Sequence, residues 1–209
     1  MRENLNRRII IYLAGPCGSG KTTLSLLLEN LINANTKSSA QAVGIDGFHY
    51  RQEYLNNNYL YKNGDKILMR DIKGSAETYD FEKLRDKIKA LKNGDVYFPC
   101  YDRIIHDVVE DFIFINGQII IIEGNWILLD EENWRELAQF CDYSIFITAE
   151  RETLIKRLTE RKIMGGLSFD EAQNFVMRSD VKNIERILNR RLKCDLELNM
   201  TEDGSYYIK

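Results

Sequence analysis

The fold can be worked out from Ile9-Ile10-Ile11-Tyr12-Leu13-Ala14-Gly15-Pro16-Cys17-Gly18-Ser19-Gly20-Lys21-Thr22-Thr23, a stretch near the start of this 209-residue sequence. Residues 9–14 form a short apolar run rich in isoleucine, which is typical of a buried strand. Residues 15–22 fit the pattern G-x-x-x-x-G-K-[ST] without a gap, and an apolar face over 21–33 predicts a helix. The strand, the lysine, the hydroxyl and the helix together argue against a glycine-rich turn that binds nothing.

The spacing of this loop has a mechanical reason. Its glycines let the backbone curl so that successive N–H groups point inward, where they bind phosphate oxygens, and the following helix adds its positive end. We therefore expect a nucleoside triphosphate here, with Lys21 at the β- and γ-phosphates and the Thr22 hydroxyl on Mg²⁺. The residues expected to bind the nucleotide are Gly15, Pro16, Cys17, Gly18, Ser19, Gly20, Lys21, Thr22 and Thr23.

Composition argues against several classes of protein. Lys and Arg number 29 against 32 Asp and Glu, and no block of like charge marks a nucleic-acid surface. No apolar run reaches the length of a membrane span and no signal peptide precedes the first strand, so we expect a cytoplasmic protein that binds neither nucleic acid nor membranes. The four cysteines lie far apart, unlike a zinc site or a disulfide framework. The length suits a single domain over 1–209, and a homo-oligomer stays open.

Two carboxylates are predicted at the ends of strands. A strand over 41–46 ends at Asp46, and the apolar run 119–122 ends at Glu123. Ligands of open α/β sheets bind at the carboxyl ends of strands, which makes both acids candidates for the site. The alternative for Asp46 is a hairpin turn with Gly47, although no alternating return strand follows. The alternative for Glu123 is an acid that only accepts backbone hydrogen bonds.

The rest of the chain predicts alternating helices and strands. Helices are expected over 80–93, 130–140, 150–162 and 168–192, and a strand over 143–148. Hairpins are expected to join 111–115 to 118–122 through Asn116-Gly117, and 195–200 to 205–208. The pattern predicts an α/β fold with a doubly wound, mainly parallel five-stranded sheet, helices on both faces, a C-terminal hairpin and a helical lid.

Two segments are expected to move or to bind. Residues 50–79 are irregular and rich in Asn and Tyr, which is typical of a binding excursion, here placed on the side of the phosphate acceptor. Arg157 and Arg161 share one helix face before the break at Gly165-Gly166, and we expect a lid over 157–170. The basic residues over 178–191 are most simply a solvated helix face.

Three classes of P-loop protein are weighed. A GTPase would need a base-reading Asn/Thr-Lys-x-Asp, which is absent, and Asp71-Ile72-Lys73-Gly74 matches only the weak D-x-x-G pattern. A non-catalytic nucleotide-binding regulator would need a second module, for which the length leaves no room. A small-molecule kinase needs a base, a carboxylate for Mg²⁺ and mobile arginines, which Asp46, Glu123 and the pair Arg157 and Arg161 supply. We therefore predict a kinase.

These residues make the chain similar to the uridine kinase, pantothenate kinase and phosphoribulokinase group of P-loop kinases over about residues 8–200. The shared motifs are the phosphate loop, Val43-Gly44-Ile45-Asp46-Gly47-Phe48-His49, Tyr79-Asp80-Phe81, Pro99-Cys100-Tyr101-Asp102 with His106, Ile121-Ile122-Glu123-Gly124, and the helix with Arg157 and Arg161. The resemblance implies that Asp46 is the general base, that Glu123 serves the metal, and that the two arginines close on the phosphates.

The resemblance also implies an acceptor site. Tyr101 and His106 would line it, and Tyr79 and His49 are the further candidates for contact with substrate. The alternatives are a core position for Tyr101, a turn-capping role for His49 and an ordinary loop position for His106. The implied reaction is in-line transfer of the γ-phosphoryl group of ATP, with Mg²⁺, to the hydroxyl of a small-molecule alcohol.

The segment before Tyr79 departs from the uridine kinases proper. Those enzymes carry an Asp-His-Pro stretch there, whereas this chain has Lys73-Gly74-Ser75-Ala76-Glu77-Thr78. This form resembles a branch described as uridine or nucleoside kinases, some of whose members act on sugars or related alcohols. A uridine-type nucleoside is the first expectation for the acceptor. A sugar, glycerate or a pantothenate-like alcohol is the alternative.

Overall fold

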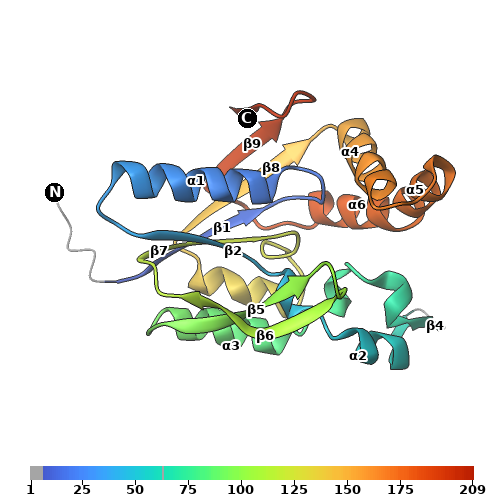
Figure 1. Cartoon of the computed structure of the whole chain (residues 1–209), viewed down its shortest axis with the longest axis horizontal. Coiled ribbons are helices and arrows are strands. Elements are labelled where there is room, and N and C mark those ends of the chain that lie inside the picture. The colour runs from blue at the N-terminus through green and yellow to red at the C-terminus, as the bar shows by residue number, and fades with distance from the viewer. Residues whose placement is uncertain (1–6, 63) are drawn as a thin grey trace.

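The computed structural model describes residues 7–62 and 64–209, and its centre is a sheet in the order β10-β9-β8-β1-β7-β2 (Figure 1). The strands are β1 (Ile9–Ala14), β2 (Ala40–Gly44), β7 (Ile119–Gly124), β8 (Tyr143–Ala149), β9 (Leu196–Met200) and β10 (Tyr206–Ile208). From β9 to β2 all neighbours run parallel, and β10 pairs antiparallel with β9. The predicted parallel five-stranded sheet is therefore confirmed, with the C-terminal hairpin built into its edge.

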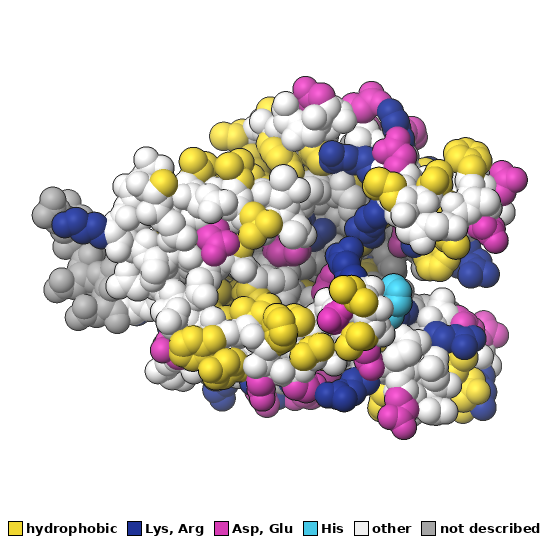
Figure 2. All heavy atoms as spheres, in the orientation of Figure 1, with side chains coloured by type: hydrophobic (Ala, Val, Ile, Leu, Met, Phe, Trp, Pro, Cys, Tyr) yellow, Lys and Arg dark blue, Asp and Glu magenta, His cyan; other side chains and the backbone are white. Residues whose placement is uncertain are grey.

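The excursion over 50–79 folds into short elements of its own. They are α2 (Gln52–Asn57), the antiparallel pair β3 (Tyr59–Lys62) and β4 (Asp65–Leu68), and the 3₁₀ turns η2 (Met69–Ile72) and η3 (Ala76–Thr78). The helices α4 (Arg151–Met164) and α5 (Phe169–Phe175) lie across a hollow from this excursion (Figure 2). Within residues 7–62 and 64–209, no helix has the length and apolar character needed to cross a membrane.

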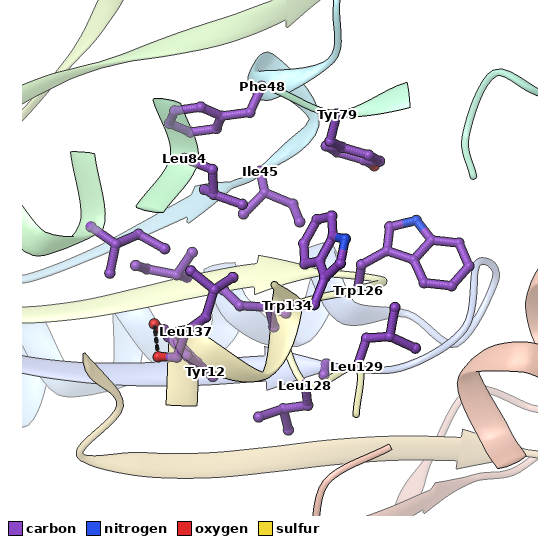
Figure 3. Close-up of a cluster of buried hydrophobic side chains, with 14 of the residues drawn as sticks. Tyr12, Ile45, Phe48, Tyr79, Leu84, Trp126, Leu128, Leu129, Trp134 and Leu137 are labelled. Atoms are coloured by element: carbon purple, nitrogen blue, oxygen red, sulfur yellow. Dashed lines mark hydrogen bonds between the residues drawn. The ribbon is translucent and has the colours of Figure 1, made fainter. Parts of the chain in front are cut away.

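Helices cover both faces of the sheet because side chains of a strand alternate between faces. Leu13 of β1 packs with α1 (Lys21–Asn35) and α4, whereas Tyr12 packs with α3 (Phe81–Leu91) and the 3₁₀ segment η4 (Trp134–Phe140). The buried cluster around Tyr12, shown in Figure 3, includes two tryptophans. The buried Tyr12 hydroxyl donates to the Leu137 carbonyl at 2.9 Å. The central strands are isoleucine-rich because they are buried on both faces.

The predicted hairpin of 111–115 with 118–122 is wrong. Strand β6 (Asp107–Ile115) pairs antiparallel with β5 (Val96–Asp102), while β7 enters the central sheet between β1 and β2. The Asn116-Gly117 turn is held by Gln41 of β2, whose Oε1 accepts from both backbone N–H groups at 2.7 and 2.6 Å. Burial of Ile120, Ile121 and Ile122 in the sheet outweighs the local preference for a two-residue hairpin.

Two helix predictions also need correction. Residues 130–140 form only η4, which starts after Asn133, and Asp130 does not cap it. The predicted helix 168–192 starts at the expected capping box on Ser168 but ends at Asn189, and its middle is a π-helical segment, η5 (Val176–Asp180), between α5 and α6 (Val181–Asn189). The cap expected at Asp80 is present, because its side chain accepts from the Lys83 backbone N–H.

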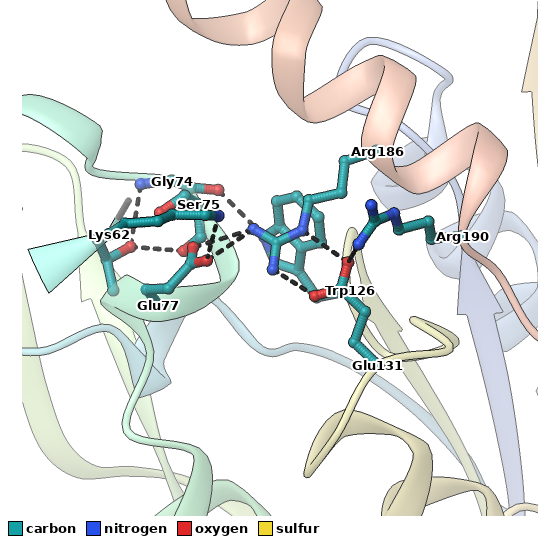
Figure 4. A network of polar contacts seen from close by, with 9 residues as sticks. Lys62, Gly74, Ser75, Glu77, Trp126, Glu131, Arg186 and Arg190 are labelled. Atoms are coloured by element: carbon teal, nitrogen blue, oxygen red, sulfur yellow. Dashed lines mark hydrogen bonds and ion pairs between the residues drawn. The ribbon is translucent and has the colours of Figure 1, made fainter. Parts of the chain in front are cut away.

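The solvated-face prediction fails at Arg186 of α6 (Figure 4). Its guanidinium donates to Glu77 at 2.9 and 3.0 Å and to Glu131 at 3.0 and 2.6 Å, and it lies 5.3 Å from the centre of the Trp126 ring. Helix α6 is therefore fixed to η3 of the excursion and to the loop after β7.

Candidate active site

The phosphate loop between β1 and α1 has the backbone that its glycines predict. Gly18 and Gly20 take φ values of 86° and 80°, in the left-handed region that favours glycine. A Cβ on Gly15 would lie 2.5 Å from the Ile147 carbonyl oxygen, so β8 also requires a glycine there. Lys21 is 7% exposed, and its Nζ donates to the Pro16 carbonyl at 3.0 Å.

A cavity of about 510 Å³ opens over this loop. Its lining residues are Cys17, Gly18, Gly20, Lys21, Thr22, Thr23, Asp46, Arg103, Glu123, Asn125, Arg157, Glu160, Arg161 and Met164. Most of the predicted nucleotide residues therefore face one space with the two predicted carboxylates and both lid arginines. Gly15, Pro16 and Ser19 lie behind this surface, where they shape the loop without lining the cavity.

Thr22 and Glu123, the two residues predicted to serve the metal, lie in contact with each other. The Thr22 hydroxyl donates to Glu123 Oε1 at 2.8 Å, and a Cβ on the neighbouring Gly44 would lie 3.2 Å from that oxygen. Burial raises the pKa of Glu123, an effect that nearby Lys21 opposes and nearby Asp46 reinforces. Within the described residues there is no group of three or more His, Cys, Asp or Glu that could hold a metal ion. One hydroxyl and one carboxylate beside a phosphate site suit Mg²⁺, which keeps several waters and uses substrate phosphates as ligands.

Asp46 lies in the 3₁₀ turn η1 (Asp46–Phe48), directly after β2. The hairpin alternative is excluded, because α2 rather than a return strand follows this turn and β2 pairs instead with β7. The turn also packs so closely against β5 that a Cβ on Gly47 would overlap the Pro99 carbonyl. The buried Tyr79 hydroxyl donates to Asp46 Oδ1 at 3.2 Å. Burial, reinforced by Asp46, raises the pKa of Tyr79 well above its usual value, so the phenol remains a donor.

His49 stacks beside this pair. Its ring centre lies 3.8 Å from that of Tyr79 and 6.3 Å, edge-on, from that of Tyr101. Its Nδ1 lies 3.2 Å from the Thr78 carbonyl oxygen. Burial lowers the pKa of His49 against the opposing influence of Asp46, which keeps the imidazole neutral near pH 7. His49 therefore packs against the aromatic rings beside Asp46 without adding a full positive charge there.

A second, smaller cavity of about 120 Å³ continues from the first. It is lined by Cys17, Asp46, His49, Gly74, Tyr79, Arg103, Asn125, Arg161, Asp180, Asn183, Ile184 and Ile187. The two cavities share Asp46, Arg103, Arg161 and their neighbours Cys17 and Asn125. Asp46 therefore lies at the junction of the two cavities. A molecule bound in the small cavity would there lie next to the phosphates of a nucleotide bound in the large cavity.

The lid arginines approach the phosphate loop from α4. Arg157 Nη1 lies 3.5 Å from the Gly18 carbonyl oxygen and also contacts Met200, and Arg161 Nη2 lies 3.8 Å from Cys17 Sγ. Figure 2 shows Lys and Arg side chains gathered along the hollow on this face. Their charges are thus placed beside the expected position of the β- and γ-phosphates.

A family model described as "Phosphoribulokinase / Uridine kinase family" matches residues 10–191. The chain belongs to this family. It is 40% identical over 205 residues to the "Uncharacterized protein YggC" of Escherichia coli, covering 98% of this chain and 83% of that protein. It is 30% identical over 200 residues to a "Putative uridine kinase" of Schizosaccharomyces pombe, covering 92% of this chain and 83% of that protein. The family resemblance seen in the sequence is confirmed.

The family also accounts for the fold. A solved structure from Silicibacter sp. TM1040, described as a "putative fructose transport system kinase", matches with a TM-score of 0.84 and 31% identity, covering 94% of this chain and 92% of that one. Membership of the phosphoribulokinase/uridine kinase family makes the chain a P-loop kinase that uses a nucleoside triphosphate. The family is named for kinases with different acceptors, so membership does not decide the acceptor.

His106 does not join the other predicted acceptor residues of this kinase. It is exposed, has a φ of 55° in the turn between β5 and β6, and lines neither cavity. Arg103 of the same turn lines both cavities, and Asn125 follows Glu123-Gly124 at the end of β7. Asn125 has a signal in the sequence, because it directly follows a strand that carries a predicted ligand. Tyr101 lines neither cavity, and its ring contacts that of His49, which lines the small cavity.

Replacing Arg157 and Arg161 together by alanine should lower kcat by about 10- to 100-fold while affinity for a fluorescent ATP analogue changes less than threefold. Both guanidiniums stabilise mainly the charge that develops on the transferring phosphoryl group. The expected loss in kcat is moderated because Arg161 is exposed to solvent. Turnover and nucleotide titration on one preparation measure the two effects. Lys156→Ala, an exposed change on the same helix, is the control. An affinity loss equal to the loss in kcat/KM would contradict a transition-state role.

Proposed function

We propose that this kinase transfers the γ-phosphoryl group of ATP to a hydroxyl of a small, neutral polyol of the sugar type. The observation that carries the proposal is the placement of Asp46 at the junction of the two cavities. A base at that junction can take the proton of an acceptor hydroxyl as it attacks the γ-phosphorus in line.

The work of this chain in such a transfer is positioning and charge stabilisation. Asp46 accepts the hydroxyl proton, and the Tyr79 hydroxyl, which donates to it at 3.2 Å, orients the carboxylate. Lys21 and the lid arginines would face the equatorial oxygens, where their charges stabilise the charge that develops during transfer. Mg²⁺ held by Thr22 and Glu123 would neutralise charge on the β- and γ-phosphates.

A nucleoside is less well supported as the acceptor. A nucleoside would stack its base on Tyr101 and take a hydrogen bond from His106. His106, however, lies outside both cavities. The Lys73 ammonium lies 4.7 Å from the centre of the Tyr101 ring and donates to the Tyr101 hydroxyl and to Gln52 Oε1, both at 2.9 Å. Lys73 thus already contacts the hydroxyl end of the Tyr101 ring on which a nucleobase would stack. The 31% identical structure described as a putative fructose transport system kinase also favours a sugar.

A GTPase function finds no further support. Asp71 of the D-x-x-G match is exposed and lines a separate cavity with Arg178 and Lys182, apart from the phosphate loop. A non-catalytic regulator is also disfavoured, because a base, a metal pair and two arginines around one phosphate site are needed for transfer and are not needed for binding alone.

A panel of acceptors tests the proposal by release of ADP. The purified protein with ATP and Mg²⁺ is offered D-fructose, D-ribose, uridine, cytidine, D-glycerate and pantothenate. We expect a sugar to exceed uridine by at least about 100-fold in kcat/KM, because a site built for particular hydroxyls discriminates strongly. Preference for uridine would refute the sugar acceptor and leave the kinase. ADP release that never exceeds the acceptor-free rate would refute the proposed function.

A further inference from the structure

The helical segment from Phe169 to Asn189 contains one irregular turn, the π-helical η5. π-bulges are rare and are frequent at functional sites, because the wider turn re-aims a side chain that a regular helix would send elsewhere. Here the turn ends at Asp180, which lines the small cavity together with Asn183 and Ile184 on the next turn. Asp180 and Ile184 carry no sequence signal for function, since the surrounding charges suggest a solvated face.

Asp180 is a partly buried carboxylate, one oxygen of which is shielded from solvent and makes no hydrogen bond to the described residues. Its side chain is 16% exposed, and no donor within residues 7–62 and 64–209 makes a hydrogen bond to its Oδ2. Lys162 Nζ lies 3.4 Å from that oxygen, close enough for an ion pair but without the geometry of a hydrogen bond. Burial raises the pKa of Asp180, against the opposing influence of Lys162 and Arg161. A buried carboxylate left in this state costs stability unless something donates to it.

The two ends of the small cavity differ in chemistry. Asp46, Arg103 and Arg161 are shared with the nucleotide cavity, so the reacting hydroxyl belongs at that end. Asp180 and Asn183 line the small cavity but not the nucleotide cavity, which places them at the part that does not react, and Asn183 also borders the separate cavity of Asp71. A carboxylate only accepts hydrogen bonds, and an amide both donates and accepts, which together suits hydroxyl groups on adjacent carbons. An acidic group placed there would be repelled by Asp180.

We infer that Asp180 and Asn183 hold the non-reacting hydroxyl groups of the acceptor and thereby restrict it to uncharged polyhydroxy compounds. The inference rests on the proposed kinase function and adds to it the residues that select the acceptor. It excludes glycerate and pantothenate, each of which carries a carboxylate. It also gives a reason for the π-helical turn, whose last residue, Asp180, lines the same small cavity as Asp46.

Asp180→Asn, which keeps size and polarity, tests the inference on the sugar that the wild-type enzyme phosphorylates best. We expect kcat/KM for that sugar to fall by about 10- to 100-fold, mostly through KM, because an amide is a weaker acceptor than a carboxylate. The KM for ATP should change less than twofold. Asp170→Asn, an exposed change on α5, is the matched control and should leave both parameters unchanged.

Singly deoxygenated analogues of the same sugar separate recognition from a structural role. If Asp180 accepts from one hydroxyl, the analogue that lacks it should be a poor substrate for the wild type and equally poor for Asp180→Asn. The preference for the parent sugar should therefore shrink at one position alone. Lys162→Met provides the comparison for the ion pair, and it should retain the discrimination at that position.

The outcomes separate this inference from the proposed function. A wild-type enzyme that phosphorylates a sugar while Asp180→Asn matches it on every analogue would overturn the inference and leave the kinase intact. If glycerate or pantothenate were the best acceptor, the inference would likewise be overturned and the kinase would remain. A lost discrimination in Lys162→Met equal to that in Asp180→Asn would assign Asp180 to the ion pair. Failure of every acceptor would remove the proposed function and, with it, the inference.

Discussion

Lys21→Ala should abolish phosphoryl transfer, lowering kcat/KM by at least about 10³-fold, while the fold remains intact. Lys21 is nearly buried at the base of the nucleotide cavity, and its Nζ makes one bond within the loop, to the Pro16 carbonyl. The ammonium has two further protons for phosphate oxygens. Since alanine removes the charge and leaves the backbone cradle unchanged, the loss should appear in turnover. Coupled assay of ADP release with the best acceptor measures it.

Lys37→Ala is the control for Lys21→Ala, because Lys37 is exposed beyond the end of α1 and far along the chain from the loop. It should retain full activity. Thermal unfolding of both variants should stay close to that of the wild type. A folded Lys21→Ala protein with a normal rate would remove the assignment of the nucleotide site.

Asp46→Asn should lower kcat by about 10²-fold or more and leave the KM for ATP nearly unchanged, as expected for the loss of a positioned base. The amide oxygen can still accept from Tyr79, so the local structure should persist. Because Asp46 raises the pKa of Glu123, the substitution should also lower that pKa and favour the ionised metal ligand at acid pH. The metal site therefore remains competent while catalysis is lost.

Steady-state kinetics with ATP and acceptor varied in turn provide the measurement. Asp71→Asn, an exposed change in the excursion over 50–79, is the matched control. A near-normal kcat in Asp46→Asn would show that the acceptor proton leaves by another route, and the candidate base would be withdrawn. A large rise in the KM for ATP would instead point to a role in holding the nucleotide.

The parts of the fold that local chemistry specifies were predictable. The phosphate loop, the caps at Asp80 and Ser168 and the isoleucine strand all depend on neighbours within a few residues. The partner of β6 was not predictable, because Asn116-Gly117 is a strong hairpin signal and the competing contact, Gln41, is 75 residues away. Long-range pairing decides such cases, and a local pattern carries no information about it.

The candidate site likewise contains residues that could be predicted from the sequence and residues that could not. Asp46 and Glu123 could be placed because the carboxyl ends of parallel strands meet at one edge of the sheet. Asp180 and Asn183 could not, because helical periodicity does not reveal a π-helical turn and their neighbours are charged. His106 was expected from its spacing after Tyr101, but spacing along a hairpin does not fix which side of its tip faces the cavity, and Arg103 takes that place.

The contacts of Arg186 have a consequence for how the enzyme meets its acceptor. One guanidinium joins α6 to Glu77 of the excursion and to Glu131, and the Trp126 indole beneath it donates to the Gly74 carbonyl at 3.0 Å. Helix α6, which carries Asn183, and the loop that carries Gly74 are therefore held against each other without a bound acceptor. Acceptor selection is then preorganised, and little entropy is lost in shaping the cavity around each arriving molecule.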